Sequence, residues 1–432
     1  MGPMAESKTV FIDIDELRVG MFVYLDLGWM SHPFPSSSFR IGNEKQLETI
    51  RSLNLTRVRY SAEKSDQPHD AEAAALATQA APTQAEVDEA AQTQAAQALR
   101  LREILATQRE RFAVCEQNFV RATQACTQVM NCVGPQPDLA RELSQVLIGE
   151  IVGQMMAEGE SMVHLLSDGS GDRAALHPVN VTVICLLLGK AMGLSEPQLQ
   201  LLGMAALLHD AGKSQLPERV RWREPTFTAM EDKIHQEHVA MSVTAAQRMG
   251  LSAPILLGIA QHHEMVDGTG FPLGLKGEGM SPAARILALV NRYDNLCNPA
   301  NPNLALTPHE ALALIFSQTK TRFDAASLNA FIRLMGVYPP GSVVQLVDDR
   351  FALVLSVNSS RPLRPQVIVY DPQTHKDDAL VLNLELQPEC GIKRSLKPVH
   401  LPQVALSYLS PRKRISYFFE QSVRYEGSEA HA

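Results

Sequence analysis

Apolar positions near the start of the chain predict a small module that combines strands with a helix. Val10, Ile12 and Ile14 alternate with Phe11, Asp13 and Asp15, as in a strand, and residues 19–27 and 56–60 are also typical of strands. Between them, Leu47, Ile50 and Leu53 fall near one helical face. We therefore expect an α+β module over residues 1–66.

The pattern changes in the next hundred residues. Residues 67–100 are dominated by Ala and Gln, which permit a helix but form no apolar stripe, so we expect a linker that is partly helical or disordered. A helical pattern runs from Leu101 to Val133 and stops at Gly134-Pro135. This helix could pair with a second copy of itself in a homodimer or pack on its own domain.

The centre of the chain reads as helical and the end as strand-forming. Apolar helical patterns predict helices over 138–166, 179–192, 196–208, 232–249, 255–263 and from Pro282 to 296. Five glycines make 264–280 an irregular loop. Strand patterns follow at 343–347, 351–357, 366–370 and 379–386. The prediction is a mainly α protein, with a helical domain at 101–336 and a small β domain at 337–432.

Length, composition and net charge limit the classes of protein and of partner that fit this chain. The chain has 432 residues, with 45% hydrophobic and 20% charged residues, as expected of a globular protein of two or three domains. A net charge of -8 disfavours nucleic acid and anionic membranes as partners. Six scattered cysteines suit a reducing compartment, and neither apolar helical segment, 181–192 nor 199–208, reaches the ~18 residues needed to span a bilayer. We therefore expect a cytoplasmic location.

Histidines and one aspartate gather in the helical region between residues 177 and 291. They are His177, His209-Asp210, His238 and His262-His263. Imidazole and carboxylate ligands together suit iron, manganese, zinc or nickel, whereas calcium sites use oxygen ligands. The cluster predicts a metal site, although each histidine alone would more often be a structural residue.

Three motifs in this region make the chain resemble the HD-GYP family, a branch of the HD superfamily. They are H-x-x-x-V at His177–Val181, L-H-D-x-G-K at Leu208–Lys213 and H-H-E-x-x-D-G-x-G-[YF]-P at His262–Pro272. The resemblance covers roughly 138–336. Residues 10–60 also resemble a domain of unknown function that often precedes HD-GYP domains.

The resemblance implies a helical metal-dependent phosphodiesterase that hydrolyses cyclic di-GMP. It implies that Asp210 bridges two divalent metal ions, with iron or manganese favoured and zinc or nickel as alternatives. One ion would be held by His177, His209 and Asn291, and the other by His238, His262 and His263. Lys213 would place a cation near the phosphate. The remaining candidates for substrate binding are Asp267, Gly270, Phe271, Pro272, Lys276 and Arg285.

The chain departs from the family pattern at several positions. The D-x-[YF]-D motif starts with Asn291, a neutral ligand, so Asp294 is considered either as its replacement or as a supporting residue. The stretch 298–303 lacks the basic residues that grip phosphate in many relatives, for which Lys276, Arg285 or Arg292 could substitute. Arg173 stands where a three-metal branch has Glu, so two metals are expected. His235, three residues before His238, is an alternative ligand that we disfavour.

Two functional hypotheses follow from these residues. The first is an active phosphodiesterase giving linear pGpG and/or GMP through a metal-activated hydroxide. The second is a catalytically degenerate domain that binds a cyclic dinucleotide or a signalling protein without turnover, as Asn291 and the missing basic residues would favour. A third, an HD phosphohydrolase acting on another nucleotide, is disfavoured by the 262–272 loop.

Overall fold

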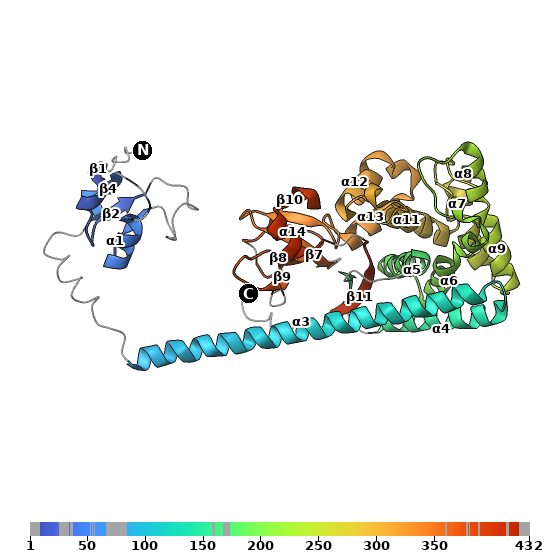
Figure 1. The fold of residues 1–432 in the computed structure, drawn as a ribbon, viewed down its shortest axis with the longest axis horizontal. Helices are drawn as coiled ribbons and strands as arrows, with labels where there is room; N and C mark the ends of the chain where they lie inside the picture. Colours follow the sequence, from blue (N-terminus) through green and yellow to red (C-terminus); the bar gives the residue numbers. More distant parts are fainter. Residues whose placement is uncertain are drawn as a thin grey trace, which may run out of the picture. The chain divides into compact units, whose positions relative to one another are not determined.

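The computed structural model describes residues 9–25, 34, 38–51, 53, 55, 57–65, 84–157, 160–166, 173–358, 361–376, 379, 381–387, 389–411 and 414–422 (Figure 1). The chain divides into two compact units, Met1–Leu101 and Arg102–Ala432. The domain boundaries expected at residues 66, 100 and 336 stay predictions.

The first unit contains a four-stranded antiparallel sheet with the strand order β1-β4-β2-β3. Leu17, Val23, Ile50 and Val58 form its buried core together with neighbouring apolar residues. The predicted combination of strands and a helix is confirmed. Its elements are β1 (Thr9–Asp13), β2 (Phe22–Tyr24), β3 (Ser38–Arg40), α1 (Glu44–Arg51) and β4 (Arg57–Ser61).

A single helix, α3 (Gln84–Cys132), is 49 residues long and begins at Gln84 rather than at the predicted Leu101. No glycine or proline interrupts this stretch, and its many Ala and Gln residues favour helix, so the second part of the expected linker is helical. Residues 66–83 lie outside the described residues. Cys115, Phe119 and Cys126 are buried in the core of the second unit. This face of α3 therefore packs on its own domain, and pairing with a second copy stays a prediction.

The second unit is built around α5, which contacts α4, α6, α11 and α13. α5 starts at Arg173, earlier than expected, and this makes it long and apolar enough to cross a membrane; however, 83% of that apolar window is buried within the protein, as in a core helix. The helices are α4 (Pro137–Met156), α5 (Arg173–Ala191), α6 (Glu196–Leu208), α7 (Glu218–Arg221), α8 (Ala229–Gln236), α9 (His238–Arg248), α10 (Ala253–Ala260), α11 (Pro282–Cys297), α12 (Pro308–Gln318), α13 (Ala325–Met335) and α14 (Gln403–Leu409).

A seven-stranded sheet completes this unit and confirms the strands expected near the C-terminus. Its main path is β10-β6-β7-β5-β11, and β8 pairs with β7 and β9. Its strands are β5 (Glu160–Leu165), β6 (Val343–Leu346), β7 (Phe351–Val357), β8 (Gln366–Val369), β9 (Val381–Asn383), β10 (Ile392–Leu396) and β11 (Tyr417–Ser422). Tyr417 and Phe418 are buried in the same core as the helices, whereas other sheet residues, such as Val344 and Val354, form a second cluster.

The prediction of helix throughout 138–166 is wrong at its end. Residues 160–165 form β5, which pairs along its whole length with β11 and at Val163 and His164 with β7. These partners lie about two hundred residues or more further along the chain, so no local pattern indicates them. His164 is buried on this strand and stacks on Phe112, with ring centroids 4.5 Å apart.

Candidate metal centre and cleft

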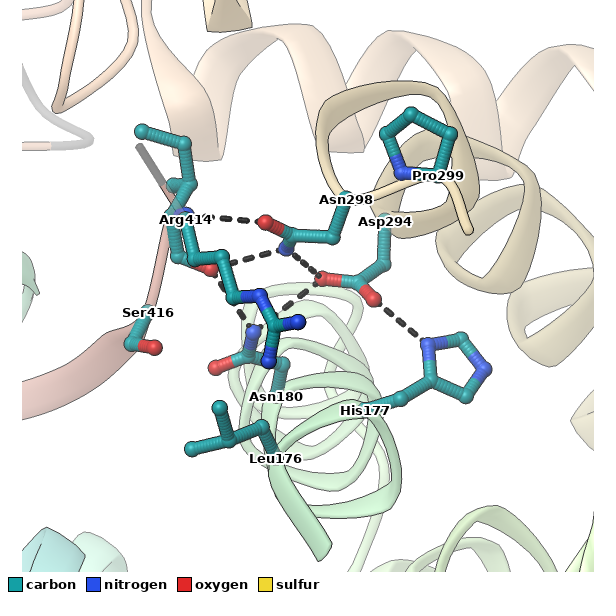
Figure 2. A pocket seen from close by; sticks show the side chains of 9 residues that line it. Leu176, His177, Asn180, Asp294, Asn298, Pro299, Arg414 and Ser416 are labelled. Atoms are coloured by element: carbon teal, nitrogen blue, oxygen red, sulfur yellow. Dashed lines mark hydrogen bonds and ion pairs between the residues drawn. The ribbon is translucent and has the colours of Figure 1, made fainter. Parts of the chain in front are cut away.

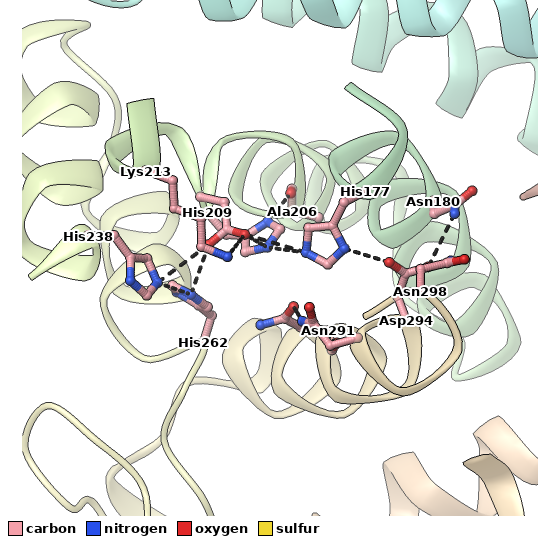
Figure 3. Close-up of polar contacts among 12 residues, drawn as sticks. His177, Asn180, Ala206, His209, Lys213, His238, His262, Asn291, Asp294 and Asn298 are labelled. Atoms are coloured by element: carbon pink, nitrogen blue, oxygen red, sulfur yellow. Dashed lines mark hydrogen bonds and ion pairs between the residues drawn. The ribbon is translucent and has the colours of Figure 1, made fainter. Parts of the chain in front are cut away.

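Five elements bring the predicted metal-binding side chains together (Figure 3). His177 comes from α5, His209 follows the last turn of α6, and His238 begins α9. His262 and His263 follow α10, and Asn291 lies on α11. Residues separated by more than a hundred positions therefore meet at one place in the helical core.

Gly212 allows two of these elements to meet. A Cβ at this position would lie 2.4 Å from the His238 carbonyl oxygen and 2.5 Å from the Ser242 nitrogen. The Gly212 N–H donates to Ser242 Oγ at 2.8 Å. Because only glycine permits this approach, the Asp210-x-Gly212 spacing fixes Asp210 against the start of α9.

The two carboxylate oxygens of Asp210 face different sets of histidines. Oδ2 lies 3.4 Å from His177 Nε2 and 3.3 Å from His209 Nε2. Oδ1 lies 3.4 Å from His238 Nε2 and 3.7 Å from His262 Nε2, and it has no hydrogen-bond partner although it is buried. The side chains form two groups that could each hold a metal ion and that share Asp210. These are His177, His209 and Asp210, and Asp210, His238, His262 and His263.

In three of these histidines, the Nδ1 atom, which points away from Asp210, donates a hydrogen bond to a backbone oxygen. Nδ1 of His209, His238 and His262 donates to the backbone oxygens of Ala206, His235 and Ile259, at 2.7, 2.5 and 2.6 Å. Because carbonyl oxygens only accept, the Nε2 atoms are left with lone pairs that point into the cluster. Metal-binding histidines are oriented in the same way, so the cluster fits divalent cations that favour nitrogen and carboxylate ligands.

Burial and neighbouring charges keep most of these groups in the forms that bind metal. Burial lowers the pKa of His238 to about 4 and, with the neighbouring imidazoles, holds the pKa of His262 and His263 well below the usual value. Burial opposes ionisation of Asp210, yet neighbouring charges, among them the Lys213 ammonium, and side-chain contacts with His177 and His209 hold its pKa well below the usual value. Neutral imidazole and ionised carboxylate are the ligating forms.

His177 differs because two carboxylates hold it. Its Nδ1 lies 2.5 Å from Asp294 Oδ2, while its Nε2 faces Asp210. Burial by itself lowers the pKa of His177, but the bonds to Asp210 and Asp294 raise it above the usual value. Figure 2 shows Asp294 between His177 on one side and Asn180 and Asn298 on the other.

Asn291 is buried on α11 and lines the same cleft as the histidines. Figure 3 shows it opposite the row of histidines. Its Oδ1 accepts a hydrogen bond of 2.7 Å from Asn295 Nδ2. The carbonyl oxygen that a cation would use is therefore already partly satisfied.

A cleft of about 610 Å³ opens beside the cluster. Its lining includes Lys213, His262, His263, Gly270 and Phe271, and Phe271 stacks on His263 with ring centroids 4.5 Å apart. Lys213 Nζ lies 2.5 Å from Asp210 Oδ2 and 5.2 Å from the centre of the Trp222 ring. Candidate metal ligands, the Lys213 ammonium and aromatic rings thus line one opening.

Four predicted substrate-binding residues lie outside the lining of this cleft. They are Asp267, Pro272, Lys276 and Arg285. Asp267 accepts from the backbone N–H and the hydroxyl of Thr269, at 2.9 and 2.6 Å. Arg285 donates to the Gly277 oxygen at 2.6 Å and lies 3.6 Å from Asp324. Hydrogen bonds within the loop and an ion pair to the start of α13 thus account for these two side chains.

Some cleft and loop residues could not be foreseen from the motifs. Arg223 and Arg322 line the cleft together with Arg292. Glu264, inside the third motif, is fully buried and accepts from the backbone N–H groups of Leu273 and Leu275, at 2.7 and 2.8 Å. The only sequence signal for a role of Glu264 was its position directly after the two histidines. In the structure, its carboxylate holds the loop that follows through these two hydrogen bonds. His235 is buried and its Nδ1 donates to the Val220 oxygen at 2.8 Å.

Comparisons with known proteins agree with this architecture. Residues 160–327 match the HD domain family, and residues 9–143 match the Domain of unknown function (DUF3391). A protein of Pseudomonas aeruginosa named cyclic di-GMP phosphodiesterase is 26% identical over 372 residues, which cover 83% of this chain and 84% of the relative. The cyclic di-GMP phosphodiesterase response regulator RpfG of Xanthomonas campestris is 31% identical over 150 residues, which cover 34% of this chain and 39% of the relative.

Among solved structures, a HDG"Y"P protein from Bdellovibrio bacteriovorus matches with a TM-score of 0.41 and 14% identity, covering 75% of this chain and 98% of that chain. The two matched families cover the helical region and the N-terminal part in the order that the motifs predict. The match over residues 160–327 shows that the helical region contains an HD domain, and its three motifs and the named relatives indicate the HD-GYP branch.

Proposed function

We propose that the protein is a metal-dependent phosphodiesterase that hydrolyses cyclic di-GMP to linear pGpG and/or GMP. The observation that carries the proposal is the position of Asp210, whose two oxygens face two separate sets of histidines. Relatives named cyclic di-GMP phosphodiesterases, one of them aligned over 83% of this chain, support the choice of substrate.

The proposed ligands divide into a four-residue and a three-residue group. Asp210, His238, His262 and His263 would hold one divalent ion, and His177, His209 and Asp210 the other, with the Asn291 carbonyl completing the second set. Iron or manganese is favoured, and zinc or nickel also fits these donors. We propose two ions rather than three because Arg173 replaces the glutamate of the three-metal branch.

Bound divalent ions would lower the pKa of a water molecule and polarise the phosphoryl oxygen that it attacks. Asp210 would help to hold both divalent ions, because its two oxygens face the two histidine sets. The Lys213 ammonium, at the edge of the cleft, would offset the charge of the phosphate. The Phe271 ring stacks on His263 and would offer its other face to a base of the substrate.

We also propose that the protein acts in the cytoplasm. None of the six cysteines, all of which lie in the described part of the chain, forms a disulfide bond, which suits a reducing compartment. The apolar helix α5 is explained by its burial in the core.

Turnover of cyclic di-GMP by metal-reconstituted full-length protein, followed by chromatography of the products, tests the proposal. We expect pGpG and/or GMP to form, and chelation to abolish their formation. 3′3′-cGAMP serves as a second substrate, because proteins of Vibrio cholerae named 3′3′-cGAMP-specific phosphodiesterases are also similar to this chain. Tight binding of cyclic di-GMP by metal-loaded protein without any product would instead support the degenerate binding domain.

A further inference from the structure

Three arginines line the cleft, and Glu224 is the one acidic side chain that lines it with them among the residues that the structure describes. They come from separate parts of the fold: Arg223 follows α7, Arg292 lies on α11, and Arg322 ends the short 3-10 turn Lys320–Arg322. All three are exposed side chains at this opening. The wall of the cleft is therefore positively charged although the whole chain has a net charge of -8.

The three arginines differ in how their charge is used. Arg223 is paired with Asp232 through contacts of 2.9 and 3.3 Å. Among the described residues, no carboxylate lies within ion-pair distance of Arg292 or Arg322, although the charge of Arg322 helps to lower the pKa of Asp267. Both guanidinium groups line the cleft and can approach an anion there.

The backbone fixes these two arginines close to the cluster. Arg292 follows Asn291 directly in α11. The Arg322 backbone oxygen accepts from the Val266 N–H at 2.9 Å, which ties it to the loop after His263.

We propose, on the basis of the function above, that Arg292 and Arg322 bind the second phosphodiester of the cyclic dinucleotide, the one that is not being hydrolysed. The macrocycle of such a ligand carries two phosphodiesters, separated by two ribose units. When one of them lies at the Asp210 cluster, the other must lie elsewhere in the same cleft. A guanidinium group matches a phosphate with two parallel N–H donors.

This assignment gives the cleft a means of selecting its substrate class. The metal cluster recognises any phosphodiester, whereas the two arginines recognise a second one at a fixed position. The basic residues absent from 298–303 are thereby replaced by arginines from α11 and the 320–322 turn. Lys276 and Arg285, also considered from the sequence, lie outside the lining of the cleft.

The test uses metal-loaded full-length protein and the variants Arg292→Gln, Arg322→Gln and Arg248→Gln. Arg248 is an exposed arginine in the last turn of α9, outside the cleft lining, and controls for the loss of one positive charge. Binding is measured with a hydrolysis-resistant phosphorothioate analogue of cyclic di-GMP. Steady-state kinetics are measured with cyclic di-GMP and with bis(p-nitrophenyl) phosphate, which carries a single phosphodiester.

We expect each cleft variant to raise Kd for the analogue, and KM for cyclic di-GMP, about tenfold, as for loss of a hydrogen bond to a charged group. The loss in kcat/KM should be several times larger for cyclic di-GMP than for bis(p-nitrophenyl) phosphate. Arg292→Lys should recover part of the affinity, since it restores charge without the paired donors. Arg248→Gln should match the wild type.

The possible outcomes separate this inference from the proposed function. If the wild type binds and hydrolyses cyclic di-GMP but Arg292→Gln and Arg322→Gln have unchanged Kd and KM, the arginine assignment is wrong and the function stands. Equal losses for the two substrates would also overturn the assignment, because they would indicate a general effect on the cluster. Wild-type protein that binds neither the analogue nor cyclic di-GMP would overturn both.

Discussion

Asp294 and His177 are joined by a 2.5 Å contact between Oδ2 and Nδ1, which places Asp294 behind a histidine of the candidate metal centre. Its other oxygen accepts from Asn180 and Asn298 at 3.2 and 2.9 Å. Of the two roles considered for Asp294 from the sequence, the geometry favours orientation of His177 over replacement of Asn291 as a ligand. A carboxylate behind a metal-binding histidine fixes its ring and raises its basicity.

Replacing Asp294 by asparagine should weaken metal binding. Asp294→Asn keeps the size of the side chain but removes the charge that faces His177, so we expect metal affinity to fall about tenfold to a hundredfold. Competition with a chromophoric chelator measures this change. Asp232→Asn, which removes a half-buried carboxylate paired with Arg223, is the matched control and should leave the affinity unchanged. Equal affinities of Asp294→Asn and the wild type would show that His177 needs no carboxylate.

The two halves of the metal centre should differ in affinity. Asp210, His238, His262 and His263 form a group of four, and Oδ1 of Asp210 is free on that side. On the other side, the Lys213 ammonium lies 2.5 Å from Asp210 Oδ2, and Asn291 Oδ1 is bonded to Asn295. A graded chelator titration should therefore remove the ions in two steps.

Asn291→Asp should bring the two steps closer together, because it adds a negative charge at the weaker side. A gain of about 1.4 kcal/mol would tighten binding there tenfold. The same titration, repeated on the variant, measures the change. Identical titration curves for variant and wild type would mean that residue 291 is not a ligand.

Single substitutions should separate the ligands from the neighbouring histidine. His262→Ala and Asp210→Ala should lower the metal content measured by elemental analysis, and Asp210→Ala should lower it further because its oxygens face both histidine sets. His235→Ala should retain the wild-type content, since the His235 ring bonds to the Val220 oxygen and only its backbone oxygen holds His238. Loss of metal from His235→Ala would contradict the choice of His238.

His164 should make the stability of the protein depend on pH. Burial lowers the pKa of His164 to about 4 from the usual 6.5. Between pH 4 and 6.5 the imidazole is protonated in the unfolded chain but not in the folded chain. The contribution of neutral His164 to the free energy of unfolding is therefore fully present above the unfolded pKa and declines as pH falls towards about 4. From about pH 7 to about pH 5 the loss is on the order of 2 kcal/mol.

Denaturant unfolding of the metal-free protein at these two pH values measures the effect. His164→Phe keeps the stacking on Phe112 and removes the titrating group, so its stability should fall less than that of the wild type over the same interval. The same pH dependence in both proteins would contradict this assignment.

The gathering of the histidines around Asp210 could be predicted from the sequence because its signal is local, whereas metal binding itself stays a prediction. Adjacent pairs such as His209-Asp210 and His262-His263 stand out in an apolar helical context. The glycine two residues after Asp210 is required because a Cβ at Gly212 would collide with the backbone of α9. The helices around the cluster could be predicted for the same reason, since apolar periodicity is a property of neighbouring residues.

Features that depend on distant partners could not be predicted in this way. β5 is a strand because β11 pairs with it from the far end of the chain. Arg322 reaches the cleft because its backbone bonds to Val266, and nothing in the local sequence around either residue indicates that contact. The role of Asp294 likewise depends on where α5 places His177.

The most direct test of the account is to follow cyclic di-GMP hydrolysis while metal is returned to metal-free protein, with the number of bound ions measured at each point. We predict that little product forms while the first ion binds, that the rate rises as the second binds, and that both level off near two ions per chain. Protein that holds two ions per chain and still forms neither pGpG nor GMP would contradict the central claim, as would full activity with a single ion.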